Sequence, residues 1–127
     1  MYTKLKDTKK AIKHYKEAIS VDPSAALPNL RLGMLYYKLK KYKDAVEPLR
    51  KSIMQSPKYA AAGYFKLGAS LMKIKRYKPA EVPLRKAVEL SPDNEIVNDT
   101  LAENLFQLST FLSDDAKPGE RIDLLRE

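Results

Sequence analysis

The chain has 127 residues, of which 44% are hydrophobic, and this is enough for one compact domain with a buried core. No apolar run of roughly eighteen residues occurs, so we expect no transmembrane segment. The N-terminus also lacks the apolar stretch of a signal peptide, which favours a cytoplasmic location without fixing the compartment. Cysteine is absent, which excludes disulfides, thiolate metal sites and thiol nucleophiles.

The formal net charge of +8 is unevenly distributed. Residues 1–86 carry 21 Lys or Arg against 6 Asp or Glu, whereas residues 87–127 carry 3 against 10. A basic body with an acidic end can attract acidic partners or pair with copies of itself.

In chain order, the sequence repeats itself about every 34 residues. Three segments align with offsets of 34 and 35 residues: Lys4–Ala11, Lys38–Ala45 and Lys73–Ala80. Each is followed in the same phase by a stripe of apolar residues and a proline, namely Pro23, Pro57 and Pro92. Proline disfavours the helical conformation of the residue before it, so these three positions mark the ends of repeat units.

The spacing within a unit predicts two amphipathic helices. Leu32, Tyr36 and Leu39 recur at three or four residues and therefore share one face of a helix. The next unit repeats this stripe, and a second stripe follows the turn in each unit. Gly33 and Gly68 fall where two helices would cross closely, so we interpret them as packing positions.

The predicted organisation is an array over residues 1–113 followed by a linker and a short helix over 114–127. Residues 1–25 form a partial repeat with only its second helix, Lys9–Val21, and an open face, as in a fragment of a longer array. Residues 26–60 and 61–94 form complete repeats, and residues 95–113 form a terminal helix that caps the third unit.

These residues resemble the tetratricopeptide repeat, a 34-residue unit with Leu-Gly, aromatic, Ala and closing Pro at the same places. The resemblance implies an all-α fold, a right-handed superhelical solenoid of helix-turn-helix repeats. It also implies a protein-interaction scaffold without enzymatic activity, in which the first helix of each pair lines a concave groove.

When the groove positions of the family are aligned with this sequence, they predict a set of partner-binding residues: Leu30, Arg31, Met34, Tyr37, Lys38, Phe65, Lys66, Ala69, Met72 and Lys73. The alternative is that its apolar members only pack between neighbouring units. Apolar pockets with a basic rim would suit a peptide or partner helix with apolar anchors and acidic flanks. We therefore expect another protein as the partner.

Some members of the family hold the C-terminal carboxylate of chaperones with a Lys, Asn, Asn, Lys, Arg clamp. The clamp's places are occupied here by Leu30, Met34, Lys66, Ile96 and Thr100, so only one basic residue matches. The resemblance does not extend to that partner.

A second surface is predicted at the turn edge, where basic residues recur in successive turns. This basic turn ridge comprises Lys40, Lys41, Lys43, Lys75, Arg76 and Lys78, with Lys6, Lys9 and Lys10 at the equivalent places of the first unit. Solvation of an exposed turn is the favoured interpretation. An acidic protein, an anionic membrane surface or nucleic acid phosphates are alternatives, and nucleic acid is the least favoured partner.

No catalytic, metal or cofactor site is predicted. His14 is the only histidine and lacks a matching Ser or Asp signature, and no glycine-rich phosphate loop occurs. The alternative to an adaptor is a self-assembly module, in which the open end and the opposite end charges join copies into homo-oligomers.

Overall fold

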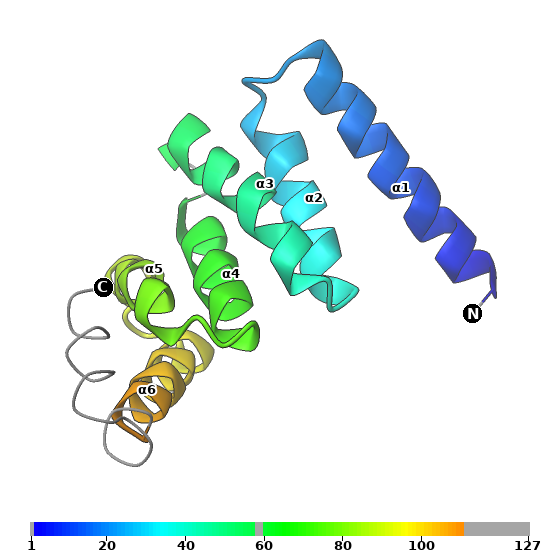
Figure 1. The fold of residues 1–127 in the computed structure, drawn as a ribbon. Coiled ribbons are helices and arrows are strands. Elements are labelled where there is room, and N and C mark those ends of the chain that lie inside the picture. The colour runs from blue at the N-terminus through cyan, green and yellow to red at the C-terminus, as the bar shows by residue number, and fades with distance from the viewer. Residues whose placement is uncertain (1, 58–59, 111–127) are drawn as a thin grey trace, which may run out of the picture.

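The computed structural model describes the backbone of residues 2–57 and 60–110, with side chains from residue 7 onward. The described residues form six helices and no strand: α1 (Tyr2–Val21), α2 (Ala26–Lys38), α3 (Tyr42–Gln55), α4 (Ala60–Lys73), α5 (Tyr77–Leu90) and α6 (Glu95–Thr110). Figure 1 shows them stacked from α1 at one end to α6 at the other. The predicted all-α fold is confirmed. No helix in this part of the chain combines the length and apolarity needed to cross a bilayer.

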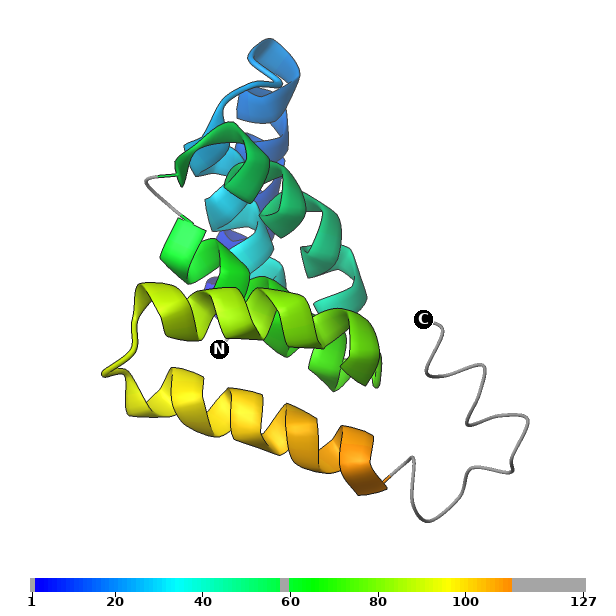
Figure 2. The same ribbon diagram turned by 90° about the vertical axis from the view of Figure 1, so that its left-hand side faces the viewer.

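Two antiparallel helix pairs form the centre of the stack. α2 packs on α3 and α4 on α5, and the two pairs join through α3 and α4. α1 packs on α2 at one end, and α6 packs mainly on α5 at the other, as the second view also shows (Figure 2). Because each helix contacts only its near neighbours, the fold is a linear array.

Close approach of a glycine and a leucine fixes the spacing within each pair. A Cβ atom added to Gly33 would lie 2.5 Å from Cγ of Leu49, and one added to Gly68 would lie 2.6 Å from Cγ of Leu84. Both leucines are fully buried. The two pairs therefore share the same crossing, and the interpretation of these glycines as packing positions is confirmed.

The turn inside each pair ends the first helix with a residue in the left-handed conformation. The N–H of Lys41 donates to the carbonyl of Tyr36 at 2.8 Å, and that of Lys40 to the carbonyl of Tyr37 at 2.9 Å. Lys40 has φ of 62°, and Lys75 has φ of 65° in the equivalent turn. This is the Schellman cap, in which glycine is the usual left-handed residue because a Cβ atom is strained there.

The first helix is longer than predicted. The sequence predicts a helix over Lys9–Val21 after a basic turn near Lys6, whereas α1 runs without interruption from Tyr2. The turn predicted near Lys6 is therefore wrong. The segment has no Gly or Pro, and a left-handed lysine costs about 1–2 kcal/mol. In the later units, packing of the first helix on the second offsets that cost, but no described helix precedes α1.

A buried amide anchors the terminal helix. Asn104 on α6 is fully buried, and its Nδ2 donates to the carbonyl of Tyr77 at the start of α5 at 2.9 Å. Val97 is buried on the same side, and Leu101 packs against the core. These contacts leave the opposite side of α6 exposed to solvent. The region predicted as a linker and short helix, 114–127, lies outside the described residues.

We predict that Gly33→Ala destabilises the chain although alanine is the better helix former. The new methyl group would force fully buried Leu49 to shift, at a cost of about 1–3 kcal/mol, against a gain of about 1 kcal/mol in helix propensity. Urea denaturation would show a lower midpoint. Ser20→Ala, at an exposed site on α1, is the control and should change stability by less than about 0.5 kcal/mol. An unchanged midpoint for Gly33→Ala would contradict the close crossing.

We also predict that Lys40→Gly raises the free energy of unfolding by about 1 kcal/mol, because glycine adopts the left-handed conformation without strain. Lys51→Gly removes the same charge in the interior of α3 and should lower stability by about 1 kcal/mol. Thermal or urea unfolding distinguishes these opposite signs. A loss of stability in both variants would refute the strained turn.

Candidate binding groove

A hollow lies where α1 meets α2, beside α4. It has a volume of about 690 Å³ and is lined by Ala11, Tyr15, Leu27, Leu30, Arg31, Met34, Leu35, Tyr37, Lys38 and Lys66. We call it the α1–α2 hollow. Six of these residues belong to the predicted groove. The volume is in the range of pockets that hold small ligands or the anchoring side chains of a peptide.

The floor of the α1–α2 hollow is apolar. Leu30 is buried beneath it, whereas Leu27 and Met34 are 37% and 38% exposed. Leu30 is therefore covered by helix packing, whereas Leu27 and Met34 are left partly open to solvent. The exposed pair, together with Tyr15 from α1, offers a surface that an apolar side chain of a partner could cover.

The rim of the hollow carries only positive charge. Arg31 and Lys38 are exposed, Lys66 is half-buried, and no acidic residue lines the hollow. Within the described residues, none of the three cations forms an ion pair. The rim therefore presents uncompensated cations beside apolar surface.

Aromatic rings hold Lys66 in place. Its Nζ lies 4.3 Å from the centre of the Tyr37 ring and 5.4 Å from that of Phe65. A cation over an aromatic face is attracted by the ring's electron density. Burial lowers the pKa of Lys66 from its usual value, because desolvation disfavours the charged form.

A second aromatic contact supports Tyr37 itself. Its ring meets that of Tyr42 edge to face, with centres 5.3 Å apart. Burial, and to a smaller extent the neighbouring Tyr42, raises the pKa of Tyr37. The tyrosine therefore remains neutral at physiological pH and acts as a platform for Lys66.

The remaining predicted groove residues lie along α4, and they are Phe65, Ala69, Met72 and Lys73. Met72 and Lys73 line a smaller hollow of about 190 Å³, together with Lys75, Tyr77, Glu103 and Gln107. Phe65 and Met72 also pack against the core. Ala69 is only 1% exposed, so its assignment to the binding surface is wrong.

Sequence reasoning missed the contribution of α1 to the site. Ala11 and Tyr15 line the α1–α2 hollow, although their stripe predicts only packing within the first unit. Leu27, one turn before Leu30, was missed as well. Its place on the same face of α2 as Leu30 and Met34 is the signal that could have found it.

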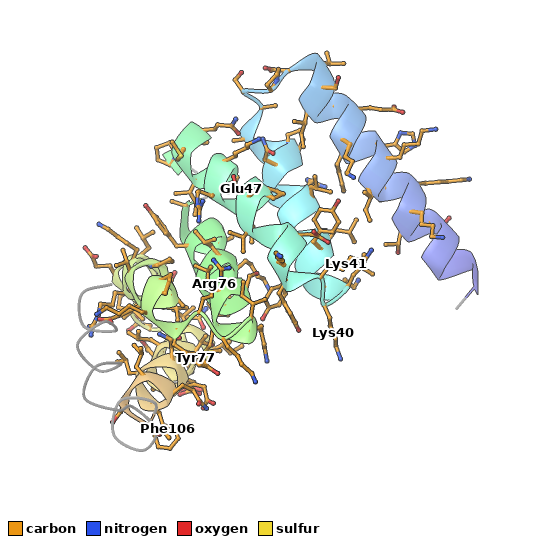
Figure 3. The ribbon with its side chains drawn as sticks, in the orientation of Figure 1. Lys40, Lys41, Glu47, Arg76, Tyr77 and Phe106 are labelled. Atoms are coloured by element: carbon orange, nitrogen blue, oxygen red, sulfur yellow. The ribbon has the colours of Figure 1, made fainter. Side chains whose placement is uncertain are left out.

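The basic turn ridge lies apart from this hollow. Lys40 and Lys41 extend from the turn before α3, and Arg76 lies at the equivalent turn before α5 (Figure 3). Lys40, Lys41, Lys43, Lys75 and Arg76 are exposed and Lys78 is half-buried, and none of the six pairs with an acidic residue in the described chain. A hollow of about 230 Å³ lies beside the ridge, lined by Lys43, Val46, Glu47, Arg50, Leu71, Ile74 and Arg76.

His14 is exposed on α1, with Nδ1 3.9 Å from the Glu17 carboxylate. The described residues include no group of three or more His, Cys, Asp or Glu placed to hold a metal ion.

Family comparisons agree with the repeated helix pairs. The family described as "Tetratricopeptide repeat" matches residues 28–59 and 61–94, and "TPR repeat" matches residues 1–40. The chain belongs to the tetratricopeptide repeat family. No curated protein sequence matches this tetratricopeptide repeat chain.

Several solved tetratricopeptide repeat domains share the fold. The first domain of Spaghetti (RPAP3), bound to the HSP90 peptide SRMEEVD, is 21% identical, with a TM-score of 0.74 and coverage of 85% of each chain. The second domain of human RPAP3, in complex with the HSP70 peptide SGPTIEEVD, is 21% identical, with a TM-score of 0.71, and the match covers 82% of this chain and 86% of that one. The Sgt2 domain from Aspergillus fumigatus is 19% identical, with a TM-score of 0.72 and coverage of 91% and 82%. The predicted solenoid of repeats is confirmed.

We predict that Tyr37→Leu releases Lys66 from its ring. In ¹³C-labelled full chain, the methylene signals of Lys66 should be shifted upfield by the ring and should return toward ordinary positions in the variant. In the wild type, the same side chain should titrate below 10.5, because burial lowers its pKa. Lys66 methylene signals at ordinary positions in the wild type would contradict the stacked geometry.

Proposed function

We propose that this chain is an adaptor that binds an acidic peptide or helix with apolar anchors in the α1–α2 hollow. The observation that carries the proposal is the combination of an exposed apolar floor with a rim of cations only. Met34 and Leu27 would cover an apolar side chain of the partner, and Arg31, Lys38 and Lys66 would face its carboxylates.

The apolar floor and the cationic rim would contribute differently to the affinity for a partner. Burial of apolar surface contributes about 25 cal/mol for each Å² removed from water. The cations contribute less net affinity but guide acidic partners and reject basic ones. Because Lys66 is held by Tyr37 and Phe65, less side-chain entropy is lost when it meets a carboxylate.

The related domains support the class of ligand but not its identity. The peptides named in the RPAP3 structures both end in Glu-Glu-Val-Asp, which places acidic residues beside an apolar one. This chain lacks the asparagines of the carboxylate clamp and shares only about a fifth of its residues with those domains. We therefore propose the same chemical type of ligand. The rim would recognise acidic side chains within the peptide and not its C-terminal carboxylate.

Self-assembly is the second candidate function. It is favoured by the negative charge around α6, because residues 87–110 contain five acidic residues and no Lys or Arg. Such a segment complements the basic hollow at the other end of the stack.

We predict that selection of a random peptide library on the full chain enriches sequences with Asp or Glu beside Leu, Met or Phe. The enriched peptide, labelled and measured by fluorescence anisotropy, should lose at least about tenfold in affinity for Arg31→Glu/Lys66→Glu, because two attractive rim charges become repulsive. Lys13→Glu/Lys51→Glu makes the same change in net charge at exposed lysines outside the hollow.

The control variant should bind the enriched peptide within about twofold of wild type at physiological salt, where charges beyond a Debye length are screened. Equal losses in the two variants would assign the effect to net charge. Enrichment of peptides without acidic residues would also refute the proposal.

A further inference from the structure

The exposed side of α6 has the features of a ligand for the hollow. Glu95, Asp99 and Glu103 recur every four residues and are exposed on one side of the helix. Ile96 and Phe106, one turn before Asp99 and two turns after it, lie on that same side and are 68% and 64% exposed. We call these five residues the acidic face of α6.

Ile96 and Phe106 add two large exposed apolar side chains to the acidic side of the helix. Within the part of the chain that the structure describes, packing leaves both side chains uncovered. α6 contacts α5 and α4 through its other side, where Val97 and Asn104 are buried. Figure 3 shows Phe106 directed outward at the end of the stack.

The acidic face and the α1–α2 hollow match in charge spacing. Arg31 and Lys38 lie two turns apart on α2, a rise of about 10 Å. Glu95 and Glu103 are separated by about 12 Å along α6. Two carboxylates could therefore meet two rim cations at once, with Phe106 or Ile96 over the apolar floor.

The two surfaces cannot meet within one chain. α1 and α2 lie at one end of the array and α6 at the other, as both views show (Figures 1 and 2). Among the described helices, α6 has no substantial contact with α1 or α2. A contact between these surfaces therefore requires two molecules.

We infer that the α1–α2 hollow of one copy receives the acidic face of α6 from a second copy. The inference rests on the proposed function, because it names a partner for the same hollow. The contacting surfaces differ, so the association is head-to-tail and leaves a free hollow and a free α6 for further copies. Because the contact depends on charge, added salt weakens it.

The test is a charge-swap experiment, in which sedimentation velocity measures the association of full chains at low salt. Wild type should form species of two or more copies whose mass rises with concentration. Asp99→Lys/Glu103→Lys and Arg31→Glu/Lys38→Glu should each remain monomeric, because each variant sets like charges against each other. In an equal mixture, the reversed α6 of one variant faces the reversed hollow of the other, and the complexes should return.

Recovery in the mixture is a result that a misfolded variant cannot give. The matched control, Lys13→Glu/Lys51→Glu, should assemble as wild type does. A monomeric wild type at every concentration, or a mixture that stays monomeric, would overturn the inference. If the enriched library peptide still binds a monomeric wild type through Arg31 and Lys66, the proposed function stands and only the self-association fails.

Discussion

The structure depends on the close approach of a glycine on the first helix of each pair to a leucine on the second. At Gly33 and Gly68, any side chain would collide with Leu49 or Leu84, both of them fully buried. Because interiors are packed densely, this contact sets the distance between the two helices and the direction in which the next pair stacks. It also assigns one side of α2 to the core and leaves the other free.

The binding surface follows from that division. Met34 remains exposed next to Arg31, and the ring of Tyr37, packed against Tyr42, holds the ammonium of Lys66 from the neighbouring unit. The hollow is therefore assembled from consecutive units, and its cations come from helices that packing has already fixed. At α6, the corresponding free surface is acidic, so one repeated framework presents opposite charges at its two ends.

The repeat spacing was sufficient to predict the helix pairs, because the positions of Leu32, Gly33 and the closing prolines recur in phase. It also indicated Arg31 and Lys66 as rim residues. It could not predict the burial of Ala69 or the part played by Tyr15, since both depend on how neighbouring helices cover one another. The uninterrupted α1 was missed for a related reason: the local pattern near Lys6 matches a turn, but such a turn needs tertiary packing to hold its left-handed lysine.

The most direct test of the account is a map of amide chemical shifts in ¹⁵N-labelled full chain as the enriched acidic peptide is added. The largest changes should surround Arg31, Met34 and Lys66, and changes on the outer side of α5 should be small. Changes concentrated at Lys40 and Lys75 on the basic turn ridge, with none around the α1–α2 hollow, would contradict it.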